Sequence, residues 1–142
     1  MHRFRHMEKQ HRLALAFALL AFIATPVSAA TWTASAAKWV NVQTRRNATS
    51  YIDAGSIRAR GNIRETWQKD VHDVADPRSV TTDITHWEYD CAKRKAALTF
   101  SEGYLKGGTS AGGLGIPVSQ RIWDAVLPTS PAAAMLQFAC SH

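Results

Sequence analysis

The stretch SPAAAMLQFAC at 130–140 has the features of a helix, and it carries one of only two cysteines in the chain. Ser130 is a typical helix N-cap, and the missing N–H of Pro131 costs nothing at the first helical position. Apolar residues then recur at helical spacing: Ala132, Met135, Leu136, Ala139 and Cys140. Gln137 is almost the only polar residue among them. The pattern predicts a helix over 131–140 that is buried over much of its circumference.

Upstream of this helix the sequence has the alternation of strands. In TDITHWEYDC at 82–91, Thr85, Trp87, Tyr89 and Cys91 share one parity, so one face of this strand is aromatic and ends at the other cysteine. The short junction after it predicts a hairpin with the alternating stretch 93–104. Further strands are predicted at 39–43, 49–53 and 63–70, with a turn at 60–62 and a loop at 73–82, and 118–127 is predicted as a final strand or an extended segment. The stretch GGTSAGGLG at 107–115 has five glycines in nine residues, which predicts a flexible connection.

The same alternation predicts which strand faces are buried. In 63–70, Ile63, Glu65 and Trp67 lie on one face, and the other face is wholly polar, which favours contact with water. In 93–104, Ala96, Leu98 and Phe100 lie together on one side. Four tryptophans occur at positions that are expected to point inward, where large rings bury apolar area: Trp39, Trp67, Trp87 and Trp123.

Residues 1–29 have the layout of a secretory signal peptide. Residues 1–12 are basic, 13–24 (LALAFALLAFIA) are apolar, and small residues follow Pro26. Such an apolar run spans about 18 Å as a helix, against the ~30 Å hydrocarbon core of a membrane, and an uncleaved anchor is the alternative. Cleavage after Ala29 or Ala30 leaves a single domain over 30–142 with no further membrane span. No cysteine stands at the cleavage site that follows the apolar run, so we predict a periplasmic protein without a lipid anchor.

Export bears directly on Cys91 and Cys140. In an oxidising compartment an even pair of cysteines is expected to form a disulfide. The chain-entropy model gives roughly 4 kcal/mol of stabilisation for a loop of about 49 residues. The alternative is a catalytic thiol, but the apolar helix around Cys140 disfavours a thiolate.

These features together predict an α+β fold. We expect an antiparallel β-sheet of about six strands with one C-terminal α-helix, packed on one face and tied to the sheet by the disulfide. The sequence has no internal repeat and no regular alternation of strands and helices, which argues against a doubly wound fold.

The charge of the chain argues against nucleic acid as a partner. The formal net charge is +6, but from Ala30 onward 13 basic residues stand against 10 acidic ones. A surplus of three over a whole domain favours solubility and does not indicate a polyanion-binding stripe.

Basic residues nevertheless gather in two clusters beside predicted turns. One cluster contains Arg58, Arg60 and Arg64, and the other contains Lys93, Arg94 and Lys95. Charged residues beside turns are usually the solvated ends of hairpins. If the two clusters converge in the fold, they form a patch for an anion or a glycan.

The sequence holds no catalytic constellation. The histidines of the exported part, His72, His86 and His142, lack the spacing of metal ligands, and the parity of His86 predicts that it faces solvent. The serines lie outside any nucleophile elbow, and the glycine-rich stretch lacks the ending of a phosphate loop. We therefore predict no catalytic residue, no cofactor and no metal site. The enzymatic alternative is a small periplasmic hydrolase that uses Glu65, His72 or His86, and it requires one of them in a concave pocket beside another titratable group.

The order of several short motifs is more specific than any one of them. The first half has Trp39-Val40, YIDAGSI at 51–57, Arg60-Gly61-Asn62 and Trp67. The second half has EYDC at 88–91 followed by basic residues, then Tyr104, Trp123, PTS at 128–130 and Cys140. From about residue 39 to residue 140, the chain resembles the surface-adhesin protein E-like domain of bacterial exported proteins. The resemblance implies an antiparallel sheet with a C-terminal helix held to it by a cystine, and a non-enzymatic role, since its founding examples bind host extracellular-matrix proteins.

We therefore expect an exported, non-enzymatic binding module of the surface-adhesin protein E-like type. Its partner would be a protein or a host-matrix component, bound at the solvent-facing side of the sheet or at an edge strand. Pairing of edge strands would also give a homodimer. A true host-matrix adhesin is the more specific alternative.

Overall fold

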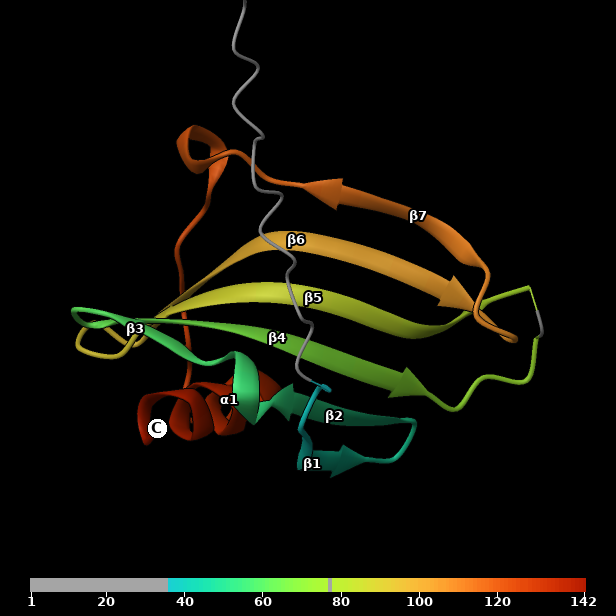
Figure 1. Cartoon of the computed structure of the whole chain (residues 1–142). Helices are drawn as coiled ribbons and strands as arrows, with labels where there is room; N and C mark the ends of the chain where they lie inside the picture. Colours follow the sequence, from blue (N-terminus) through green and yellow to red (C-terminus); the bar gives the residue numbers. More distant parts are fainter. Residues whose placement is uncertain (1–35, 77) are drawn as a thin grey trace, which may run out of the picture. The chain divides into compact units, whose positions relative to one another are not determined.

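The computed structural model describes residues 36–76 and 78–142, so the predicted signal peptide lies outside the described residues. An antiparallel sheet of eight strands carries the helix α1 on one face (Figure 1). The strands are β1 (Trp39–Arg45), β2 (Ala48–Asp53), β3 (Arg58–Arg60), β4 (Ile63–His72), β5 (Val80–Asp90), β6 (Lys95–Leu105), β7 (Ser110–Gly115) and β8 (Asp124–Ala125). Two short 3-10 helices, η1 (Ala54–Ser56) and η2 (Val118–Gln120), and α1 (Pro131–Cys140) complete the described part of the chain.

Six of the strands form one continuous path, in the order β1-β2-β4-β5-β6-β7. The sheet therefore has more strands than the six or so that the sequence predicts, and the path includes β7, which was not among the predicted strands. The two further strands are short: β3 has three residues and pairs with β4, and β8 has two and pairs with β6. The predicted α+β fold, with antiparallel strands and one C-terminal helix, is therefore confirmed.

The glycine-rich stretch is a strand, and the prediction of a flexible connection was wrong there. Residues 110–115 form β7 and pair with β6, with Gly113 opposite Glu102 and Leu114 opposite Ser101. A Cβ atom at Gly113 would lie 3.1 Å from the Glu102 Cβ, so the missing side chain lets the two strands approach closely. The predicted last strand is also shorter than expected, since only Asp124–Ala125 of 118–127 is a strand.

Helix α1 begins as the sequence predicts. Ser130 is the N-cap and Pro131 the first helical residue. The Ser130 hydroxyl donates to the Leu127 carbonyl at 2.7 Å instead of capping the helix. On the side toward the sheet, Met135, Leu136 and Ala139 are buried against a core that contains Ile52, Tyr89, Ala96 and Val126.

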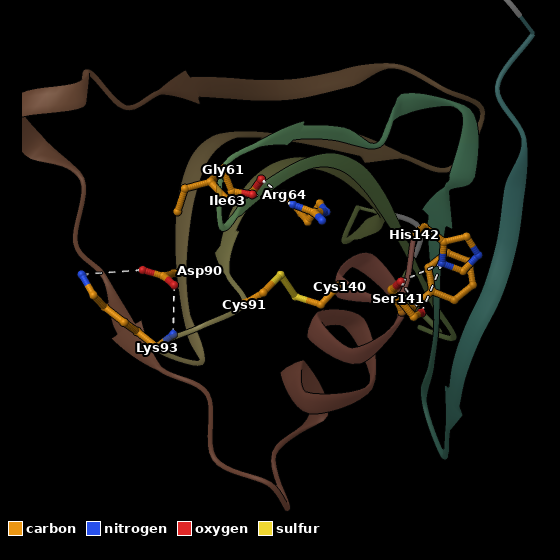
Figure 2. The surroundings of a disulfide bond; sticks show 10 residues. Gly61, Ile63, Arg64, Asp90, Cys91, Lys93, Cys140, Ser141 and His142 are labelled. Atoms are coloured by element: carbon orange, nitrogen blue, oxygen red, sulfur yellow. Dashed lines mark hydrogen bonds and ion pairs between the residues drawn. A yellow bond between two sulfur atoms is a disulfide. The ribbon is translucent and has the colours of Figure 1, made fainter.

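A disulfide fixes the end of α1 to the sheet (Figure 2). It joins Cys91, the first residue of the turn after β5, to Cys140, the last residue of α1, with 5.7 Å between the Cα atoms. The predicted pairing is confirmed. The cross-link adds a covalent bond at the point where the aromatic face of β5 meets the helix.

The faces of β4 are the reverse of those predicted. Thr66 and Gln68, from the wholly polar face, are buried, because the register places them opposite Trp87 and Thr85 on the side that α1 covers. Their polar groups have partners: the Gln68 amide donates to the Tyr89 hydroxyl, and the hydroxyls of Thr66 and Ser56 lie 3.3 Å apart. Burial of polar groups is tolerated when they are hydrogen-bonded, and this is the physical reason for the error.

A β-bulge corrects a second prediction. In the pairing of β5 with β6, His86 lies opposite Phe100 but Trp87 lies opposite Leu98, so Thr99 is an extra residue. An extra residue reverses the side-chain alternation beyond it. Phe100 consequently lies with Trp67, with ring centroids 5.5 Å apart, and not on the side of Ala96.

Candidate binding surface

The sheet face opposite α1, here called the open face, carries a cluster of aromatic rings. The ring centroids of Trp67 and His86 are 4.9 Å apart, and the two ring planes meet at 62°. The Trp67 ring also packs edge-on against Phe100. Trp67 is 37% exposed, so the expectation that it points inward was wrong. Of the other tryptophans, Trp87 packs against the core, and Trp39 and Trp123 are half-buried. Trp67 is thus the ring of this cluster that is most available to a partner, since His86 and Phe100 are half-buried.

His86 is a half-buried member of this cluster and not the solvent-facing residue that its parity predicted. The Thr99 hydroxyl donates to the His86 carbonyl at 3.1 Å, and His86 Nδ1 in turn donates to that hydroxyl at 2.6 Å. Burial lowers the pKa of His86 from its ordinary value of 6.5, and the carboxylates of Glu65 and Glu88 oppose this only in part.

The stability of the domain should therefore fall in mild acid. The pKa of His86 is lower in the folded state than in the unfolded state, so the unfolded state takes up a proton first as the pH drops below 6.5. We expect the urea midpoint of unfolding to fall between about pH 7.5 and about pH 5.5, and to fall less in His86→Gln. Equal pH dependence in the parent and the variant would contradict the assignment.

Charged side chains surround the cluster in one network. The Glu88 carboxylate, only 6% exposed, accepts from Arg121 Nη1 at 2.7 Å and from Arg60 Nη2 at 3.0 Å. Arg60 also pairs with Glu65 at 2.8 Å. Because Arg121 follows η2, its bond to Glu88 anchors the segment between β7 and β8 to the open face.

The three residues of the hydrolase alternative have separate partners. Glu65 is paired with Arg60, and His86 with Thr99, although both lie on the open face. His72 lies at the far end of β4, where its Nε2 is 2.7 Å from Asp83 Oδ2. Within the described ranges no three His, Cys, Asp or Glu side chains gather as metal ligands would.

The two basic clusters of the sequence lie at one end of the sheet, here called the hairpin end. It comprises β3, the β3–β4 turn, the adjoining ends of β4, β5 and β6, and the β5–β6 turn (Figure 1). Ile63 lies opposite both Arg60 and Asp90, and Asp90 lies opposite Lys95. The Cys91 N–H donates to the Asn62 carbonyl at 2.9 Å, which joins the two turns directly.

The six basic residues of the hairpin end have different surroundings. Arg60 is held by Glu65 and Glu88, and the Lys93 ammonium lies 3.8 Å from Asp90. Arg58 is exposed and donates to the carbonyls of Gly55 and Ile57, whereas Arg64 is half-buried and donates to those of Gly61 and Ile63. Arg94 is exposed in the turn and Lys95 is half-buried. Figure 2 shows residues of both turns around the disulfide.

Sequence reasoning found the basic residues but missed the open-face cluster. Nothing in the spacing links Trp67 to Phe100 or Glu88 to Arg121, because these contacts depend on strand register and on the bulge at Thr99. The one available signal was the position of Glu65 on the same parity as Trp67.

In the described part of the chain, helices long and apolar enough to cross a membrane are absent.

Comparison with known proteins relates the chain to one family. The family Surface-adhesin protein E matches residues 39–141. Among solved structures, Haemophilus influenzae protein E matches with a TM-score of 0.52 and 16% identity, over 72% of this chain and 83% of that one. A structure of protein E from non-typeable Haemophilus influenzae matches with a TM-score of 0.50 and 14% identity, over 77% and 79% of the two chains. No curated protein matches the chain in sequence.

Proposed function

The chain belongs to the surface-adhesin protein E family, and we propose on this basis that it is an exported, non-enzymatic binding module. Its partner is a protein or a host-matrix component met outside the cytoplasm, and the more specific form of the proposal is a host-matrix adhesin. The observation that supports the proposal most is the family match, which covers residues 39–141 and thus nearly all of the described domain.

The arrangement of the surface agrees with binding. The open face presents the exposed Trp67 ring, and the hairpin end presents exposed cations. The charged groups of the open face are paired with one another, as Glu88 is with Arg60 and Arg121, which supports a structural role for them over a catalytic one. The predicted homodimer remains a prediction, and β1 and β7, the outer strands of the main path, are the edges at which it would form.

Solid-phase binding tests the proposed function. Residues 30–142, produced in an oxidising compartment, are applied to wells that are coated with solubilised basement-membrane matrix. We expect saturable binding. We expect it to be lost when the domain has been reduced and alkylated, because the disulfide that ties α1 to the sheet is then absent. Binding no greater than that of the reduced domain would contradict the proposal. Antibody labelling of intact cells then separates a displayed adhesin, which is labelled, from a periplasmic module, which is not.

A further inference from the structure

The positive charge of the domain is concentrated at the hairpin end. Two further residues are counted with this end: Arg121, because it binds Glu88, and Asp124, because it pairs with Ala96. The hairpin end then has seven basic and four acidic residues. The rest of the described chain has six of each. The whole surplus of three charges therefore lies at one end of the sheet, although the overall composition indicated no polyanion-binding stripe.

Exposure increases this asymmetry. The side chains of Glu88, Asp90 and Glu65 are 6%, 13% and 31% exposed. Their basic partners extend into solvent: the side chain of Arg60 is 64% exposed and that of Lys93 74%. Arg58 and Arg94 are exposed as well, and Asp124 is the exposed acidic residue of this end. A ligand approaching from outside meets guanidinium and ammonium groups before it meets carboxylates.

We propose that the hairpin end binds a sulfated polysaccharide, chiefly through Arg58, Lys93 and Arg94. This inference rests on the proposed function, since it names the class of matrix component that the module contacts. Guanidinium groups form paired hydrogen bonds with oxyanions, which suits sulfate esters. Arg94 also lines a hollow of about 440 Å³ beside the disulfide, and this hollow offers room for an anionic group next to Arg94.

The dimensions and polarity of the surface favour a chain of sugars over other anionic partners. Neighbouring strands are about 4.8 Å apart, so the backbone row from Arg60 across β4 and β5 to Lys95 spans about 14 Å, which is longer than a single small anion. The two turns themselves hold none of the exposed large apolar side chains, although Ile122 follows Arg121, and Leu127 follows Val126, whose N–H donates to the Arg94 carbonyl. An anionic membrane surface would favour apolar side chains that insert, and the two turns offer none.

Binding to heparin tests the inference. The domain of residues 30–142 is compared with the triple variant Arg58→Gln, Lys93→Gln, Arg94→Asn; asparagine is chosen because Arg94 has φ of 52°. The matched control, Arg45→Gln, Arg46→Gln, Lys106→Gln, loses the same charge from exposed positions at the other end of the strands, where Arg45 ends β1, Arg46 lies in the β1–β2 turn and Lys106 lies in the β6–β7 turn. If the triple variant melts at a lower temperature than the parent, the double variant Arg58→Gln, Lys93→Gln replaces it.

We expect the parent to bind heparin in a salt-dependent manner. We expect it not to bind hyaluronan, which is unsulfated. The hairpin variant should bind about tenfold more weakly or worse, and its dependence of log Kd on log salt should be shallower by about one for each cation removed. The control variant should stay within about twofold of the parent. Equal losses in the two variants, or preference for phosphatidylglycerol vesicles over heparin, would overturn the inference. If the parent binds the matrix but does not bind heparin, the inference about the sulfated polysaccharide is overturned and the proposed function stands. If the parent does not bind the matrix, the proposed function itself is rejected.

Discussion

Replacing Cys91 by alanine should lower the free energy of unfolding by about 4 kcal/mol, and replacing Cys140 by alanine should cost about the same. Each change opens the same loop, whose ends are 49 residues apart. The open loop gains entropy in the unfolded state, and α1 loses its covalent tie to the sheet. Urea denaturation of the two single variants and the double variant measures the effect. A loss of this size is a large share of the ~5–15 kcal/mol that stabilises a typical domain.

The double variant distinguishes a bonded pair from two independent side chains. It should be little less stable than either single variant, because the two cysteines act as one unit. Adding a reductant should bring the parent to the same stability as the double variant. Additive losses, or a parent that is insensitive to reductant, would show that the two residues act separately.

Replacing Leu136 by alanine should lower the free energy of unfolding by about 2–5 kcal/mol. Leu136 is 3% exposed and lies in the core cluster with Tyr89 and Met135, so truncation leaves a cavity that α1, held at its C-terminal end by Cys140, fills only in part. The matched control is Leu127→Ala, since Leu127 is 62% exposed shortly before the helix and should change stability very little. Equal, small effects at both leucines would mean that the helix does not pack on the sheet as described.

The parts of the fold that follow from local chemistry could be predicted from the sequence. Ser130 and Pro131 set the start of α1, the apolar spacing set its buried side, and the short turn after Cys91 set the β5–β6 hairpin. These features depend on neighbours along the chain. The disulfide followed from the count of cysteines together with the expectation of export, and the structure confirms it.

The errors concern strand faces, registers and the extent of the last strands, all of which depend on partners distant in sequence. Polar Thr66 and Gln68 are buried because other strands and η1 supply their hydrogen bonds, and a hydropathy pattern does not record such partners. Phe100 lies on the open face because of the bulge at Thr99, which a strict alternation excludes. The convergence of the basic clusters is of the same kind. It required the pairing of Ile63 with Asp90 and the bond from Cys91 to Asn62, and neither is visible in the spacing of the arginines and lysines.

The proposed role depends on export of the chain from the cytoplasm and on oxidation of Cys91 and Cys140 to the disulfide. The intact mass of the protein recovered from a periplasmic extract, recorded after treatment with an alkylating agent, tests both at once. We predict a chain that begins at Ala30 or Thr31, weighs two hydrogens less than its reduced form and carries no alkyl group. A chain that still contains residues 1–29, or one with two alkylated cysteines, would contradict the account.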